Sequence, residues 1–162
     1  MPLPTQPGWP LQTSTLSACG IRTRVLQGGA DLQATEAVVF VHGNPGSGED
    51  WRELMQAASP VARVIALDMP GFGQADKPAN YPYSVEGGTA FLTEALKQLG
   101  VVRAHLVLHD FGGPWGLMWA AMNPLGVASL TLINTGVLKG YRWHYMARIW
   151  RTPIIGELQQ LL

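Results

Sequence analysis

The sequence predicts an α/β fold in which a mainly parallel sheet carries helices on both faces. Short apolar segments rich in β-branched residues alternate along the chain with segments of helical periodicity. Such alternation is typical of βαβ units, whose strands run parallel and whose helices cover the sheet. Polar residues directly follow several of the apolar segments. Because ligands in such sheets bind at the carboxyl ends of the strands, we expect a site there.

Composition limits the partners and the compartment. The chain has 162 residues, enough for one domain, and 47% of them are hydrophobic, which allows a sizeable core. The 11 basic and 11 acidic residues balance, so we expect neither nucleic acid nor an anionic membrane as a partner. Cys19 is the only cysteine, and the N-terminus lacks the pattern of a secretory signal. With no apolar stretch long enough to cross a membrane, the chain is predicted to be cytoplasmic.

The first part of the chain predicts an arm, two strands and a helix. Residues 1–17 are rich in proline and are predicted to form an irregular arm, and residues 21–29 follow as an early strand. Residues 37–43 are a continuous apolar run, as in a strand buried on both faces, and end at the turn-rich stretch HGNPGSG. Residues 49–58 have helical spacing, with one face formed by Trp51, Leu54, Met55 and Ala58.

The remaining chain repeats the strand–helix plan. A strand ends at Leu67 and is followed by Asp68 and a loop of proline and glycine. The next helix covers residues 84–100, with Ser84 as its N-cap and Gly100 just beyond its end. The further predicted elements are strands at 103–110 and 127–135, and a helix at 113–122 that Asn123-Pro124 ends.

One turn carries the residue types of a nucleophile site. The apolar run LVLH ends in Asp110, and two glycines and Pro114 follow it closely at the start of a helix. Glycines allow such a sharp turn, and a helix N-terminus stabilises an ionised carboxylate. A carboxylate on this turn would project above the sheet, where it could act as a nucleophile. The alternative interpretation of Asp110 is a helix N-cap.

This turn resembles the nucleophile elbow of the α/β-hydrolase superfamily, whose serine members carry G-x-S-x-G. Aspartate at the nucleophile position, within HDFGG, is similar to the haloalkane dehalogenases and epoxide hydrolases. Three further segments resemble those enzymes in the same order and spacing: VHGNPGSGEDWREL, DMPGFGQADKP and LINTGVL. The resemblance covers roughly residues 21–162.

The resemblance implies a cofactor-free hydrolase that acts on a small, mainly apolar substrate. Asp110 would attack an electrophilic carbon, and water activated by a histidine would hydrolyse the resulting alkyl–enzyme ester. The backbone N–H groups of Asn44 and Phe111 would form the oxyanion hole, and the Asn44 side chain would bind the leaving group. No metal site is expected, because no cluster has ligand spacing. Candidate residues of the substrate pocket lie in the lid-like tail: Tyr141, Trp143 and Tyr145.

Two features separate the chain from the dehalogenases it resembles. Phe111 stands where many of them have tryptophan, and it offers no ring N–H to a halide, which leaves epoxide hydrolysis open. The family's catalytic histidine lies late in a longer chain, and no residue here matches it. The predicted organisation is therefore an arm over 1–17, a partial hydrolase core without its C-terminal strands over 18–138, and the start of a lid over 139–162.

A hypothesis of a different class is a non-catalytic half-domain. The strand predicted over 127–133 would leave an unpaired sheet edge, through which the chain could associate with itself or with a partner. Two polar residues at strand ends are predicted to be structural: His42 as a hydrogen-bonded histidine and Asp68 as a carboxylate that shapes its loop. The stretch Gly71-Phe72-Gly73 lacks the third glycine of a dinucleotide site and is predicted to be a tight loop.

Overall fold

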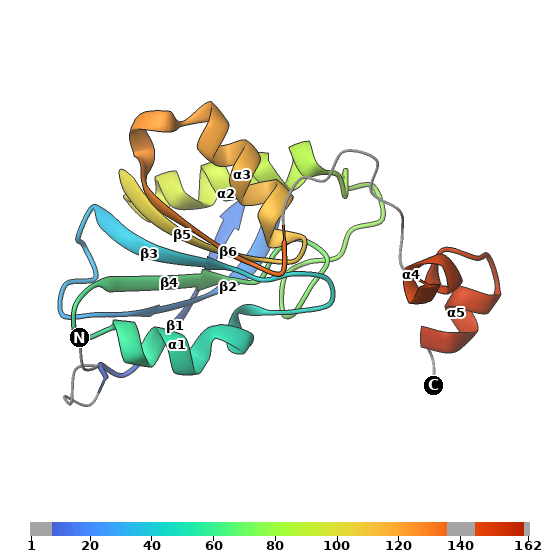
Figure 1. The fold of residues 1–162 in the computed structure, drawn as a ribbon, viewed down its shortest axis with the longest axis horizontal. Coiled ribbons are helices and arrows are strands. Elements are labelled where there is room, and N and C mark those ends of the chain that lie inside the picture. Colours follow the sequence, from blue (N-terminus) through green and yellow to red (C-terminus); the bar gives the residue numbers. More distant parts are fainter. Residues whose placement is uncertain (1–7, 136–144, 161–162) are drawn as a thin grey trace.

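A six-stranded mixed sheet forms the centre of the molecule (Figure 1). The computed structural model describes residues 8–135 and 145–160, and its strand order is β1-β2-β4-β3-β5-β6. The pairs β3–β4, β3–β5 and β5–β6 are parallel, whereas β1–β2 and β2–β4 are antiparallel, so the prediction of a mainly parallel sheet is confirmed. The strands are β1 (Gln12–Ala18), β2 (Ile21–Gly28), β3 (Glu36–Val41), β4 (Arg63–Leu67), β5 (Arg103–His109) and β6 (Val127–Ile133).

Helices cover both faces of this sheet, as predicted (Figure 1). One face carries α2 (Val85–Gln98) and α3 (Gly112–Met122), and the other carries α1 (Arg52–Ala58), which continues the 3-10 helix η1 (Gly48–Trp51). The Ser84 hydroxyl accepts the Gly87 N–H and caps α2, as predicted. The other helical elements are the 3-10 helix η2 (Pro124–Gly126), α4 (Tyr145–Trp150) and α5 (Ile155–Gln160). No helix of the described residues is long and apolar enough to cross a membrane.

Each face of the sheet has its own apolar core. The larger core joins alternate residues of β3, β4 and β5 to α2 and α3, and it includes Leu106, Leu108, Phe91 and Trp115. The smaller core packs Phe40 and Val64 against the α1 side of the molecule, where Trp51 and Met55 are buried. Every residue of β4 is buried, as expected for a strand covered on both faces.

Two predictions about local structure were wrong. Residues 12–18 are a strand and not part of an irregular arm, because β1 pairs with β2 along its whole length. The sequence signal for this strand is weak, since β1 is a mostly polar edge strand in which Leu16 packs against the core. Leu54 is 51% exposed and does not share the buried face of Trp51 and Met55. The predicted lid boundary near residue 139 lies outside the described residues.

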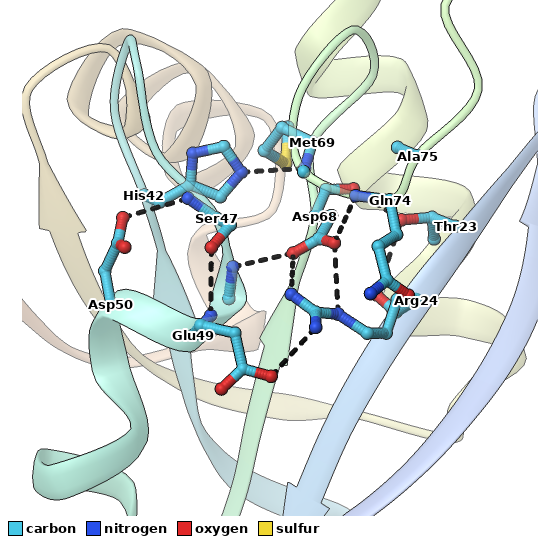
Figure 2. A network of polar contacts seen from close by, with 12 residues as sticks. Thr23, Arg24, His42, Ser47, Glu49, Asp50, Asp68, Met69, Gln74 and Ala75 are labelled. Carbon is cyan, nitrogen blue, oxygen red and sulfur yellow. Dashed lines mark hydrogen bonds and ion pairs between the residues drawn. The ribbon is translucent and has the colours of Figure 1, made fainter.

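A buried ionic network fixes the loops at the carboxyl ends of the strands, and Figure 2 shows its members. Asp68, fully buried after β4, accepts hydrogen bonds from Arg24 Nε at 3.1 Å and Arg24 Nη2 at 3.2 Å. The same carboxylate accepts the backbone N–H groups of Gly48 and Gln74, each at 2.7 Å. Arg24 also pairs with Glu49 at 2.8 Å. Asp68 is therefore the loop-shaping carboxylate that the sequence predicted.

We expect Asp68→Asn to lower the free energy of unfolding by about 3–5 kcal/mol, because it leaves the buried Arg24 guanidinium short of a countercharge. Urea denaturation followed by circular dichroism measures the change. The matched control is Glu36→Gln, which weakens the exposed pairs of Glu36 with Arg103 and His105 and should cost less than about 1 kcal/mol. Equal costs for the two variants would contradict this account.

Candidate functional site

Asp110 lies on a sharp turn between β5 and α3. Its φ of 48° is in the left-handed region, which side chains other than glycine rarely adopt. The Gly113 N–H donates to the Asp110 carbonyl at 3.0 Å, and the Thr135 hydroxyl also donates to that carbonyl. These bonds tie the turn to the start of α3 and to the chain that follows β6. The turn therefore has the form predicted for a nucleophile elbow.

Glycines let the ends of β3 and β5 meet at this turn. A Cβ added to Gly43 would lie 2.4 Å from Asp110 Cβ and 2.6 Å from Asp110 Oδ1. A Cβ on Gly112 would lie 2.3 Å from the carbonyl oxygen of Val41. Side chains at these two positions would push the elbow away from β3, so both glycines are required by close approach of the backbone.

The backbone of Asn44 contacts the carboxylate directly. The Asn44 N–H donates to Asp110 Oδ1 at 2.8 Å, which places one predicted oxyanion-hole donor on the predicted nucleophile. Phe111 follows Asp110 at the N-cap of α3, and its ring packs against Trp115 with 6.0 Å between the centroids. The structure thus brings Asp110, Asn44 and Phe111 together, as the sequence predicted.

A cavity of about 540 Å³ opens beside Asn44 and Phe111. Its wall is mainly apolar and rich in aromatic rings, and Lys77 is the only charged residue among the described residues that line it. The Lys77 ammonium donates to the carbonyls of Gly73 and Ala75, at 2.8 and 3.0 Å. Rings of the wall come from the loop after β4 and from α3: Phe72, Tyr81, Tyr83 and Trp115. The cavity suits an apolar ligand with few polar groups.

Sequence reasoning missed the two tyrosines of this wall. The Tyr81 hydroxyl donates to the Gly87 carbonyl at 2.8 Å, and the Tyr83 hydroxyl donates to the Pro78 carbonyl at 2.9 Å. Burial raises the pKa of Tyr81 to about 12. Both phenol protons are engaged by the backbone, so these residues shape the cavity with their rings. The sequence signal for these two residues is the stretch NYPYS, which places two tyrosines just before the N-terminus of α2.

Of the three pocket residues predicted in the tail, the structure describes Tyr145 alone. Tyr145 begins α4 and is 76% exposed, and it does not line the cavity. Tyr141 and Trp143 lie outside the described residues, so their assignment to the pocket stays a prediction. Within the described ranges, no group of three or more His, Cys, Asp or Glu residues could hold a metal ion.

The histidines that the structure describes are engaged elsewhere. His42 Nδ1 donates to the Gly43 carbonyl at 2.8 Å, and His42 Nε2 accepts the Met69 N–H at 2.9 Å (Figure 2). His42 is therefore the hydrogen-bonded structural histidine that was predicted. His109 lies edge-on to Trp51, with 6.3 Å between the centroids, and His105 binds Ser129 and Glu36. None of these contacts directs an imidazole at the Asp110 carboxylate.

The buried imidazole of His42 makes stability depend on pH. Burial lowers the pKa of His42 below its ordinary value of 6.5. Because the unfolded chain then binds this proton more readily, the stabilisation is complete above about pH 6.5 and is lost as the pH falls through the folded-state pKa. We expect the free energy of unfolding to fall between about pH 7 and pH 5, and to fall less steeply in His42→Asn. Urea titrations at several pH values measure how steeply the free energy of unfolding changes with pH. The control is His105→Asn, which replaces a half-exposed histidine. Equal slopes in the wild type and His42→Asn would contradict the assignment.

Comparisons with known proteins agree with this geometry. The family model described as "alpha/beta hydrolase fold" matches residues 36–161. The haloalkane dehalogenase of Bradyrhizobium diazoefficiens is 38% identical over 102 residues, which are 63% of this chain and 33% of that protein. The 2-hydroxymuconate semialdehyde hydrolase of a Pseudomonas species is 30% identical over 149 residues, 90% of this chain and 51% of that protein.

Solved structures extend the likeness to the fold. The haloalkane dehalogenase from Bradyrhizobium elkani superposes with a TM-score of 0.81 at 28% identity, covering 94% of this chain and 54% of its own. The chain thus spans between a third and about half of the length of these relatives. A family model that matches most of the chain, the strand order and the elbow at the end of β5 lead to one conclusion: the chain belongs to the α/β-hydrolase fold family.

Proposed function

We propose that this chain carries the nucleophile of a hydrolase that works through an alkyl–enzyme ester, with haloalkanes as its substrate class. The observation that carries the proposal is the Asp110 carboxylate on the elbow turn, held by the Asn44 N–H at 2.8 Å. The similarity to dehalogenases of Bradyrhizobium supports the substrate class.

The hydrogen bond to Asn44 gives the two carboxylate oxygens different roles. Oδ1 accepts the Asn44 N–H, so Oδ2 is the oxygen that would attack the carbon and displace halide. In the ester that results, Oδ1 is the carbonyl oxygen. When water adds to this ester, negative charge develops on Oδ1, where the Asn44 N–H would already point. The Phe111 N–H would be the second donor of this oxyanion hole.

The cavity beside the elbow supports a small apolar substrate. Its aromatic wall offers rings and no free phenol proton, since both tyrosine hydroxyls bind backbone carbonyls. The Asn44 side chain is exposed next to this cavity, and its amide N–H groups would stabilise a departing halide. Lys77 lies at the same cavity and adds positive potential for an anionic leaving group.

Epoxide hydrolysis is the second candidate, and the Phe111 ring favours it. A phenylalanine ring has no N–H to hold a halide, whereas the opening of an epoxide releases no separate anion. The alkoxide that forms instead must be protonated, and the described tyrosines of the cavity have their hydroxyls engaged. We propose the tail residue Tyr141 as the acid for this step, because Tyr145 is exposed and does not line the cavity.

The two halves of the reaction have different requirements. Alkylation of Asp110 needs only the carboxylate and an electrophile, whereas hydrolysis of the ester needs a base to activate water. The hydrogen bonds of His42 and His105 go to other groups and the His109 ring packs against Trp51, so we expect the ester to accumulate on this chain. The mass of the accumulated ester would identify the alkyl group that the substrate supplied.

We expect an intact-mass increase on Asp110 when the folded chain is incubated with 1-bromobutane or with styrene oxide. Bromobutane would leave a butyl ester and bromide, and styrene oxide would leave a hydroxyalkyl ester after uptake of one proton. Peptide mapping by mass spectrometry locates the adduct. An adduct from the bromide supports the dehalogenase, and one from the epoxide alone supports the runner-up.

The matched controls separate the nucleophile from other carboxylates. Asp110→Asn should abolish the adduct, whereas Asp76→Asn, which alters a carboxylate half-exposed beside Arg22, should leave it unchanged. Circular dichroism verifies that each variant is folded. A folded wild-type chain that gains no adduct from either reagent would contradict the proposal and favour the non-catalytic half-domain.

A further inference from the structure

The cavity beside the elbow reaches the contact between α2 and α3. Asn44 and Phe111 line it at the elbow, and Gly88 of α2 and Trp115 of α3 line it further along. Trp115 follows Phe111 by one helical turn, so it lies further from Asp110 along α3. The Trp115 indole is therefore a wall of the cavity on the side away from the carboxylate.

This indole packs directly on the backbone of Gly88. A Cβ added to Gly88 would lie 2.5 Å from Trp115 Cδ1 and 2.6 Å from Trp115 Nε1, which is closer than Cβ atoms approach other atoms in proteins. The ring therefore occupies the space that a side chain at position 88 would fill. Because Gly88 has no side chain, the ring lies back against α2 and leaves the cavity open.

A buried hydrogen bond resists separation of α2 and α3 at this point. The Thr89 hydroxyl, next to Gly88, donates to the Trp115 carbonyl at 3.1 Å. The rings of Phe72 and Phe111 flank the indole, with 6.3 and 6.0 Å between the centroids. Since the helices are tied together and rings stand beside the indole, a methyl group at position 88 would push the indole into the cavity.

The volume of the cavity favours a substrate longer than butyl. The cavity measures about 540 Å³, within the range of roughly 300–1,000 Å³ that is typical of sites for drug-sized ligands. A butyl group on Asp110 would fill only part of this space. Each further methylene that leaves water for the apolar wall favours binding by about 4-fold.

We propose that Trp115, seated on Gly88, sets the chain length that the site accepts and makes it selective for alkyl groups longer than butyl, such as octyl. The inference rests on the proposed function, since the alkyl group is the one that Asp110 would receive. Gly71 and Tyr83 form a similar pair at the cavity, where a Cβ on Gly71 would lie 2.7 Å from Tyr83 Cε1. Tyr83 is 53% exposed and can move into solvent, whereas Trp115 is 8% exposed, so Trp115 is the fixed wall.

A competition between two reagents measures the chain-length preference. The folded chain is incubated with equal concentrations of 1-bromobutane and 1-bromooctane, and intact masses give the ratio of octyl to butyl adducts. Because both reagents compete for the same carboxylate, the ratio does not depend on how reactive a given preparation is. We expect a ratio of at least about 10 in the wild type, and a ratio at least about 5-fold lower in Gly88→Ala.

Three further variants make the test specific to this contact. Trp115→Phe replaces the indole by a smaller ring and should raise the ratio of octyl to butyl adducts. In Gly88→Ala/Trp115→Phe the ratio should stay within about 2-fold of that in Trp115→Phe, because the added methyl group then has room. The matched control is Ala90→Ser, which adds one atom to an exposed position of α2 and should leave the ratio unchanged. Circular dichroism verifies that each variant is folded.

Binding of alcohols tests the same wall without any chemistry at Asp110. Isothermal titration calorimetry compares 1-octanol with 1-butanol, and we expect the wild type to bind 1-octanol at least about 10-fold more tightly. This advantage should shrink in Gly88→Ala. If 1-octanol binds in this way but neither bromide forms an adduct, the nucleophile is contradicted and the wall is supported.

Two results would overturn the inference about Trp115. The first is a wild type that binds the two alcohols equally or forms the two adducts equally. The second is a folded Gly88→Ala that keeps the wild-type preference for the longer chain in both measurements. If Gly88→Ala does not fold, Trp115→Phe decides, because an unchanged preference in that variant would show that the indole does not set the chain length.

Discussion

The site depends on one close approach, that of the backbone after β3 to the side chain at the end of β5. Gly43 has no Cβ, so the backbone at Gly43 and Asn44 can approach Asp110, and the Asn44 N–H reaches Asp110 Oδ1 at 2.8 Å. Parallel pairing of β3 with β5 brings the two loops to the same end of the sheet. The left-handed backbone of Asp110 and the glycines after it then aim the carboxylate.

A second layer of polar groups holds the loops that make this contact. Asp68 joins Arg24 of β2 to the backbone at Gly48 and Gln74, and His42 joins the end of β3 to Met69 after β4. Loss of one partner would leave the other charge buried and unpaired, which destabilises the folded state. The network therefore favours the one arrangement of the loops in which every charge is paired. Part of the cavity wall and the proposed oxyanion-hole donor, the Asn44 N–H, both lie on loops that this network positions. Stability and the geometry of the site are thus linked through the same residues.

Much of the fold was predictable from the sequence because its central elements are local and strongly patterned. The run at 37–43, the capped helix at 84–100 and the turn at Asp110 each carry their own signal, and the structure places each element there. β1 was missed because a polar edge strand is defined by its pairing with β2, which no local pattern reports. Tyr81 and Tyr83 were missed for the same reason, since only the tertiary fold brings their loop to the cavity. Leu54 follows the helical period, but it is 51% exposed, whereas Met55 next to it is fully buried.

The most direct test of the central contact is the rate of Asp110 alkylation in Gly43→Ala, with 1-bromobutane as the reagent. The added methyl group would lie 2.4 Å from Asp110 Cβ, so the elbow and the Asn44 N–H must separate. A misplacement of the reacting carboxylate by about 1 Å costs on the order of 100-fold in rate. We therefore expect a folded variant whose adduct forms about 100-fold more slowly, while Gly126→Ala, whose Cβ would meet no atom closer than 3.3 Å, reacts like the wild type. Alkylation of Gly43→Ala at the wild-type rate would contradict the account.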